Sequence, residues 1–119
     1  MAGTTVYRYV GPTTAIGVSA TSSTAVTITP VGNDQINYCG FLNTNSFPVA
    51  VTITPTSAPA AVLPAAGSSS VSIVLGVSMP SPLIVAVPAG GAGQGFSVTT
   101  IAGASNTGTI YVSPMADQT

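Results

Sequence analysis

Only four side chains in this 119-residue sequence carry a charge or a thiol: Arg8, Asp34, Cys39 and Asp117. The sequence contains no His, Lys, Glu or Trp. General acid–base catalysis needs such groups held close together, with neighbours that tune their pKa values. So few of these groups, placed so far apart in the sequence, indicate that the protein is not an enzyme. We expect no cofactor for the same reason.

Cys39 is the single cysteine, so no internal disulfide can form. It lies within Ile36–Phe41, a run typical of a strand. A cysteine nucleophile needs an adjacent base, and the sequence offers no His for that role. We therefore expect Cys39 to be a buried free thiol that packs as a small hydrophobic residue.

Metal and phosphate sites are not expected either. Asp34 follows Gly32 and Asn33, but a calcium site needs six to eight oxygen ligands, and Asp117 is the only other acid. The sequence favours an Asx-type turn at Asp34 instead. The glycine spacing of residues 90–95 is similar to that of a phosphate-binding loop. However, a strand-like run and not a helix follows these residues, and the sequence has no Lys to bind phosphate.

Nucleic acid is excluded as a partner because neutralising phosphates needs several basic side chains, and Arg8 is the only one. Arg8 lies between Tyr7 and Tyr9, and Tyr and Arg are both enriched in protein interfaces. We expect Tyr7, Arg8 and Tyr9 to contact a partner protein or a second subunit. Residues 1–10 would then form a docking arm or an edge strand.

No membrane association is expected, since the longest apolar run, Leu83–Ala89, is far shorter than a spanning helix and contains Pro88. The first five residues lack the basic start and apolar run of a secretory signal. We therefore expect synthesis in the cytoplasm without a signal peptide.

The elements that must position these residues are strands. Val, Ile and Thr make up 40 of the 119 residues, and β-branched side chains favour extended backbone. Short runs with a period of two, separated by Pro and Gly, predict a single all-β domain over residues 1–119 with eight or nine strands. The expected strands are Thr4–Val10, Thr14–Val18, Thr24–Thr29, Gln35–Leu42, Val49–Thr54, Ser69–Leu75, Leu83–Val87, Gly95–Ile101 and Gly108–Ser113. This spacing is typical of an antiparallel β-sandwich, either jelly-roll or immunoglobulin-like.

Several connections and faces can be predicted in more detail. The turn-forming residues 31–34 and 43–48 indicate hairpins between the strands they join. Val49–Thr54 alternates in its side chains, which predicts one apolar face and one hydroxylated face. Leu83–Val87 does not alternate and is expected to be covered on both faces. Residues 25–30 recur identically as residues 50–55, which predicts two equivalent strands of one sandwich.

Charged residues make up only 3% of the chain, whereas an average domain has about 25%. Soluble monomers normally spread charges over their surface to resist association. A neutral surface of Ser, Thr, Asn, Gly and Ala can be buried with almost no cost of removing charges from water. The sequence therefore predicts that much of the surface is an interface in a homo-oligomer or a larger assembly.

The whole chain, and in particular the run Ile36–Ile53, resembles small virion proteins of tailed bacteriophages. Among these it is most similar to capsid decoration (cement) proteins. The resemblance implies a β-sandwich protein, commonly trimeric, on the outside of the virion. Its partner would be the major capsid protein, and copies would bridge neighbouring capsid subunits and stabilise the shell against the pressure of the packaged DNA.

Two other functions remain open. A head-fibre or adhesin-type module would bind carbohydrate through Ser, Thr, Asn and Tyr. A surface-adsorbing protein, such as an ice-binding one, would use a flat face built from Thr27, Thr29, Thr52 and Thr54.

Overall fold

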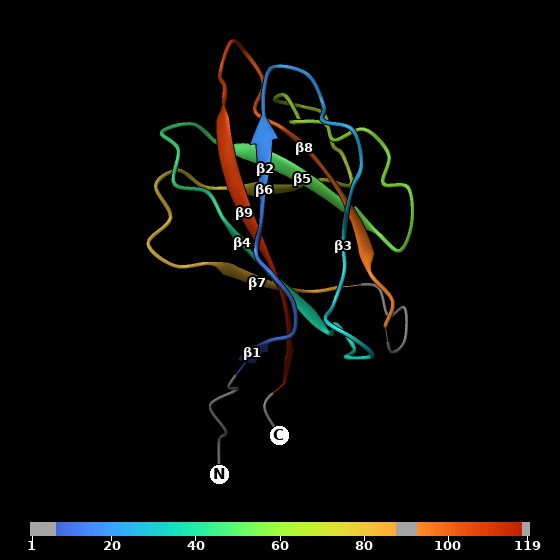
Figure 1. Ribbon diagram of the computed structural model, residues 1–119. Helices are drawn as coiled ribbons and strands as arrows, with labels where there is room; N and C mark the ends of the chain where they lie inside the picture. The colour runs from blue at the N-terminus through green and yellow to red at the C-terminus, as the bar shows by residue number, and fades with distance from the viewer. Residues whose placement is uncertain (1–6, 88–92, 118–119) are drawn as a thin grey trace.

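The computed structural model describes residues 7–87 and 93–117, and within these ranges the chain forms strands and no helix (Figure 1). Two predicted strands, 14–18 and 49–54, have the bounds that the sequence indicates, and the other described strands overlap their predicted ranges. The strands are β1 (Tyr7–Tyr9), β2 (Thr14–Val18), β3 (Val26–Ile28), β4 (Tyr38–Leu42), β5 (Val49–Thr54), β6 (Ile73–Leu75), β7 (Leu83–Ala86), β8 (Phe96–Ile101) and β9 (Gly108–Asp117). The predicted residues 4–6 of the first strand lie outside the described residues.

The strands form two antiparallel sheets, which confirms the predicted β-sandwich. Sheet A has the order β1-β9-β4-β7, with β2 also paired to β9, and sheet B has the order β3-β8-β5-β6. From β2 to β9, every connection crosses between the sheets except the one between β5 and β6, which pair with each other in sheet B. Eight strands in the orders β2-β9-β4-β7 and β3-β8-β5-β6 have the connectivity of a jelly roll. An immunoglobulin sandwich pairs its first two strands in one sheet, which is not the case here.

The hairpins predicted at residues 31–34 and 43–48 are wrong. β3 and β5 belong to sheet B while β4 belongs to sheet A, so both connections cross the sandwich. Turn-forming side chains show where the chain bends, but they do not show which strand it pairs with afterwards. In the second connection, Asn43 is fully buried and donates a hydrogen bond to the carbonyl oxygen of Gly76, which holds the bend against the β6–β7 connection.

β1 and β2 are separated from each other at a position opposite Pro114 of β9. β1 and β2 both pair with β9, and residues 10–13 between them leave the ladder next to Pro114. The carbonyl oxygen of Pro114 accepts a hydrogen bond from the N–H of Val10, so this side of Pro114 faces the interruption. Since proline has no N–H to donate, the ladder cannot continue there.

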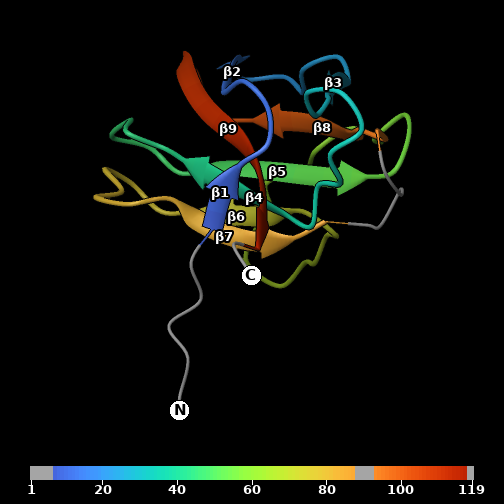
Figure 2. The ribbon, with the colours of Figure 1, turned by 60° about the horizontal axis from the view of Figure 1, so that its bottom comes forward.

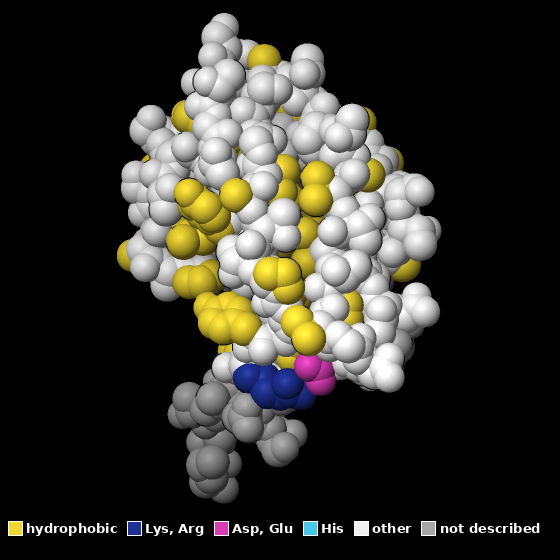
Figure 3. All heavy atoms as spheres, in the orientation of Figure 1, with side chains coloured by type: hydrophobic (Ala, Val, Ile, Leu, Met, Phe, Trp, Pro, Cys, Tyr) yellow, Lys and Arg dark blue, Asp and Glu magenta, His cyan; other side chains and the backbone are white. Residues whose placement is uncertain are grey.

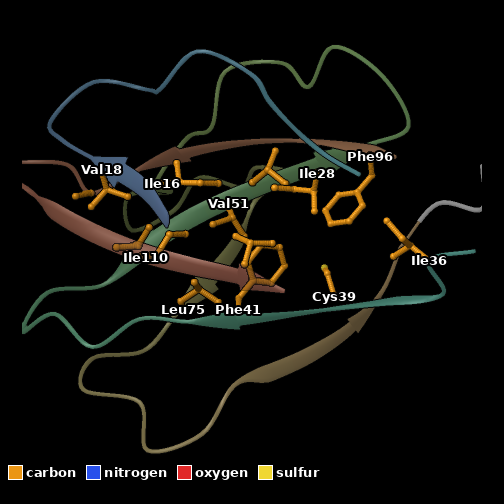
Figure 4. Packing of buried hydrophobic residues seen from close by; sticks show 14 of the residues in the cluster. Ile16, Val18, Ile28, Ile36, Cys39, Phe41, Val51, Leu75, Phe96 and Ile110 are labelled. Carbon is orange, nitrogen blue, oxygen red and sulfur yellow. The ribbon is translucent and has the colours of Figure 1, made fainter. Parts of the chain in front are cut away.

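The core fills the space between the sheets (Figure 4). Phe41 and Ile110 enter it from sheet A, while Val51 and Phe96 enter it from sheet B, and each is at most 1% exposed. The repeated segments also behave as predicted, because β3 and β5 lie on either side of β8 in sheet B. Both strands pair with β8, and both present apolar side chains to the core.

The outer face of sheet B carries the hydroxylated side chains that the alternation predicts, and the chain itself covers this face. Residues 55–72 cross it, and three side chains of the sheet hold them. Thr52 Oγ1 lies 2.7 Å from Ser72 Oγ. Ser97 Oγ accepts from the N–H of Ala58, and Thr99 Oγ1 donates to the carbonyl oxygen of Pro59.

Burial of Thr52 also removes it from the flat threonine face of a surface-adsorbing protein. Thr52 is 2% exposed and is paired with a serine of the covering segment. Thr27 and Thr29 remain exposed, but they no longer form an open face with Thr52.

Gly95, one of the glycines that imitate a phosphate loop, has a packing role. A Cβ atom at this position would collide with the backbone carbonyl oxygen of Ile28 on β3 and would lie 3.1 Å from Thr29 Cγ2. Gly93 adopts a left-handed conformation with φ of 77°. The close approach of Gly95 to the backbone of β3 explains this glycine without a bound phosphate.

We predict that Gly95→Ala lowers the free energy of unfolding by about 1–3 kcal/mol, because backbone atoms must shift to admit the methyl group. Gly76→Ala is the matched control, since no atom lies within 4 Å of its added Cβ. That variant should stay within about 0.5 kcal/mol of the parent. Urea unfolding of both variants measures the difference, and equal stabilities would contradict the packing role of Gly95.

Candidate docking face on sheet A

The outer face of sheet A is defined by the side chains that point away from the core. On β4, Cys39 and Phe41 enter the core, so Tyr38, Gly40 and Leu42 point outward. On β9, Ile110 and Val112 enter the core, so the outward residues there are Tyr111, Ser113 and Met115. β2 adds exposed Ala15 and Gly17 to the same face.

All four tyrosines of the chain belong to this face. Tyr9 lies opposite Met115, and Tyr7 lies two residues before Tyr9 on β1, so both point outward with Met115. Tyr38 also lies opposite Met115, from the other side of β9. The rings of Tyr7 and Tyr38 meet edge to face with centroids 5.0 Å apart. We call this surface, centred on Tyr7, Tyr9, Tyr38 and Tyr111, the tyrosine face.

The rings present both apolar and polar surface to a partner. Tyr9 is 64% exposed, and Tyr7 and Tyr111 are 36% and 39% exposed. Between them the face is filled by Met115, which is 4% exposed and whose methyl group lies over Gly40. A Cβ at Gly40 would lie 2.6 Å from this methyl group, so the absent side chain makes room for Met115.

Arg8 leaves the face on which its two tyrosine neighbours lie. It is paired with Ala116, a core residue, so it points to the other side of β1. There its guanidinium lies 4.0 Å from the Asp34 carboxylate. Figure 3 shows this charged pair at the lower border of a surface with many apolar side chains. The predicted contact residues Tyr7, Arg8 and Tyr9 are therefore divided between two surfaces.

No residue of the tyrosine face whose side chain is described carries a charge. The outer face of sheet B is covered by residues 55–72, whereas on sheet A β1 and β9 carry exposed tyrosines and β4 carries the half-buried Tyr38. Tyr38 and Tyr111 were not among the predicted contact residues. Alternation with Cys39 assigns Tyr38 to the outward side, but only the order of strands in the sheet brings it next to Tyr7.

Asp34 lies at the end of a backbone turn and its side chain faces Arg8. The turn at residues 31–34 closes through a 3.3 Å hydrogen bond from the N–H of Asp34 to the carbonyl oxygen of Val31. The predicted Asx-type turn is therefore replaced by a backbone turn, while the Asp34 side chain faces Arg8. Among the described residues no three His, Cys, Asp or Glu side chains come together, and no helix there is long and apolar enough to cross a membrane.

Cys39 is buried in the core with 0% exposure, as the sequence predicts. Its burial removes water from the thiol and raises its pKa to about 12. The thiolate is the reactive form of cysteine, so the folded protein holds this group in an unreactive state. Cys39 therefore contributes packing and not chemistry.

We predict that Cys39 does not react with a chromogenic disulfide reagent at pH 8 while the protein is folded. In denaturant the thiol becomes exposed, its pKa returns to the ordinary range, and one equivalent should react at once. The absorbance of the released thiolate measures both states. Rapid labelling of the folded protein, with its circular dichroism unchanged, would contradict burial of the thiol.

Comparison of the chain with protein-family models, curated proteins and solved structures finds no match. The assignment of function therefore depends on the residues described above. A sheet face with four tyrosines can pack against another surface through its rings and donate hydrogen bonds through its hydroxyl groups. This arrangement is suited to docking.

Proposed function

We propose that this protein is a structural virion protein that decorates the exterior of a phage capsid and bridges neighbouring major capsid subunits. The observation that carries the proposal is the placement of all four tyrosines on one outer sheet face. Tyrosines anchor protein interfaces because a large ring is buried at a small cost in conformational entropy. The resemblance of the chain to capsid decoration proteins supplies the partner.

The low charge supports this proposal. No charged residue lies between Asp34 and Asp117 in the sequence, so most of the surface can be buried without removing charges from water. Each copy needs only a modest affinity, since an oligomer that contacts the shell at several points gains avidity. The proposal includes a homo-oligomer, with a trimer implied by the resemblance.

Add-back to capsids that lack the protein tests this function. The purified chain should sediment with such capsids, saturate at a fixed number of copies and raise the temperature at which they release DNA. Bovine serum albumin at the same concentration is the control for trapping. Failure to sediment with capsids over the micromolar range would overturn the proposal.

Carbohydrate binding by a head-fibre or adhesin-type module is the second candidate. Exposed Tyr9 and Tyr111 favour it, because tyrosine rings stack on the apolar faces of sugar rings. Lectin domains also use the jelly-roll fold, although a fold alone does not establish a function. A glycan array distinguishes the two candidates, since a decoration protein should give no selective hit.

A further inference from the structure

β7 is an edge strand of sheet A (Figure 2). Among the described strands it pairs only with β4. Residues 83–87 are all apolar, yet Leu83 is 41% exposed, Ala86 is exposed, and Ile84 is half-buried. The predicted covering of both faces is therefore wrong within the described chain, where only the inner side packs against the core through Val85.

Natural edge strands are protected by short length, by Pro, by Lys, by inward-pointing charges, by bulges or by covering loops. β7 is short and lies between Pro82 and Pro88, but the described part of this edge carries no charged side chain. The sequence has no Lys, and no charged residue occurs between Asp34 and Asp117. The apolar surface also continues through the 76–82 connection, where Val77 is 51% exposed, to β6, where Val74 is 47% exposed.

We propose that β7 pairs antiparallel with β7 of a second copy of this chain, around a two-fold axis perpendicular to sheet A. The free edge of a strand is complementary to the same strand running in the opposite direction, which is the condition for a closed two-fold interface. The absence of charge means that two copies meet without electrostatic repulsion.

Prolines limit the partner to a strand of the same length. Pro82 and Pro88 bound the segment 83–87, and neither can donate a backbone hydrogen bond. Side chains directly opposite each other point to the same side of a sheet, so the two-fold axis must lie midway between the two copies of one residue. Pairing centred on Val85 uses all five residues and no proline. It places Ile84 opposite Ala86 of the second copy.

One consequence rests on the proposed function, whereas the pairing itself does not. A two-fold axis perpendicular to the sheet joins the two copies of sheet A and keeps both tyrosine faces on the same side. The dimer could then bind a capsid through two equivalent surfaces, which raises affinity without new contacts.

Sedimentation equilibrium of the full chain in the absence of capsids tests the pairing. We expect twice the mass of one chain for the parent, in place of the trimer that the resemblance implies. Ala86→Lys should weaken dimerisation by about tenfold or more, because it places two like charges about 7–8 Å apart across the axis. Ala15→Lys is the matched control, since Ala15 is also exposed on the outer face, but on β2 at the opposite margin. Thermal unfolding checks that both variants fold.

Cysteine cross-linking tests the register. Directly opposite residues have Cα atoms about 4.5–5.5 Å apart, within reach of a disulfide, while residues offset by two are about 7–8 Å apart. A mixture of Ile84→Cys and Ala86→Cys chains should therefore form disulfide-linked pairs under mild oxidation, and neither variant alone should do so efficiently. The native Cys39 is buried and does not compete.

A monomeric or trimeric parent, or equal effects of the two lysine substitutions, would overturn this inference. Cross-linking of either cysteine variant alone, at the rate of the mixture, would overturn the register. These results are independent of capsid binding. A chain that binds capsids as a trimer retains the proposed function and loses the pairing. A dimer that fails to bind capsids retains the pairing and loses the proposed function.

Discussion

Replacement of Asn43 by alanine is expected to lower the free energy of unfolding by about 3 kcal/mol or more. The Asn43 side chain is fully buried and makes four hydrogen bonds. Its Nδ2 donates to the carbonyl oxygens of Phe47 and Gly76, each at 2.9 Å. Its Oδ1 accepts from the N–H of Asn45 at 3.1 Å and from Asn45 Nδ2 at 2.8 Å.

Each of these partners loses a hydrogen bond in the alanine variant, and water cannot replace the side chain without opening the bend. An amide has two donors and two strong acceptor positions, so Asn43 uses its full capacity. Asn45 extends the network by donating to the carbonyl oxygen of Thr109 at the start of β9. The substitution therefore weakens the attachment of the β4–β5 connection to two other parts of the fold.

Asn43→Asp separates hydrogen bonding from shape. A carboxylate keeps the acceptor but cannot donate to the two carbonyl oxygens, and it buries a charge, so its pKa should rise above the usual range. The folded state then takes up a proton more readily than the unfolded state. The stability of this variant relative to the parent should thus increase as the pH falls from 7 to 5.

The control for both variants is Thr44→Ala. Thr44 is the adjacent residue and is exposed, so its replacement should change the unfolding free energy by less than about 0.5 kcal/mol. Urea unfolding at pH 7 measures the three variants, and a second series at pH 5 tests the aspartate. An alanine variant as stable as the threonine control would show that Asn43 does not hold the bend.

Asn43 also shows why strands were easier to predict than their pairing. The period of two and the breaks at Pro and Gly are local signals, and they located β2 and β5 with the observed bounds. Whether two consecutive strands pair depends on contacts far apart in the sequence. The bond from Asn43 to Gly76 spans 33 residues, and it accompanies a crossing between sheets where local signals indicated a hairpin.

For the candidate site, too, local signals predict part of the arrangement and contacts between distant strands determine the rest. Tyr7 and Tyr9 were predicted as contact residues from their types and spacing, and alternation alone places them on one side of β1. Their neighbours on the tyrosine face come from strands that are distant in the sequence, since Tyr38 lies 31 residues after Tyr7 and still contacts its ring. The position of Arg8 on the opposite side follows from alternation, but its contact with Asp34 depends on how the 31–34 turn is placed.

Loss of the two most exposed tyrosine rings on separate strands should abolish most of the capsid binding. Tyr9 on β1 and Tyr111 on β9 are 64% and 39% exposed, so replacing both with serine removes little packing from the folded chain. Tyrosines that anchor an interface typically contribute about 2 kcal/mol or more each when truncated. The double variant Tyr9→Ser/Tyr111→Ser should therefore bind capsids at least about 100-fold more weakly, with nearly unchanged thermal unfolding.

Two single variants show whether this loss belongs to the tyrosine face. Val31→Ser is matched to Tyr9 in exposure, at 64%, but Val31 lies in the 31–34 turn and not on a strand of sheet A. Arg8→Ala tests the other side of β1, and an exposed ion pair contributes little to stability. Both should bind capsids within about threefold of the parent, because neither removes a ring that anchors the interface. If Arg8→Ala instead weakens binding as much as the double tyrosine variant, the docking surface lies around the charged pair, and the tyrosine face is not the contact.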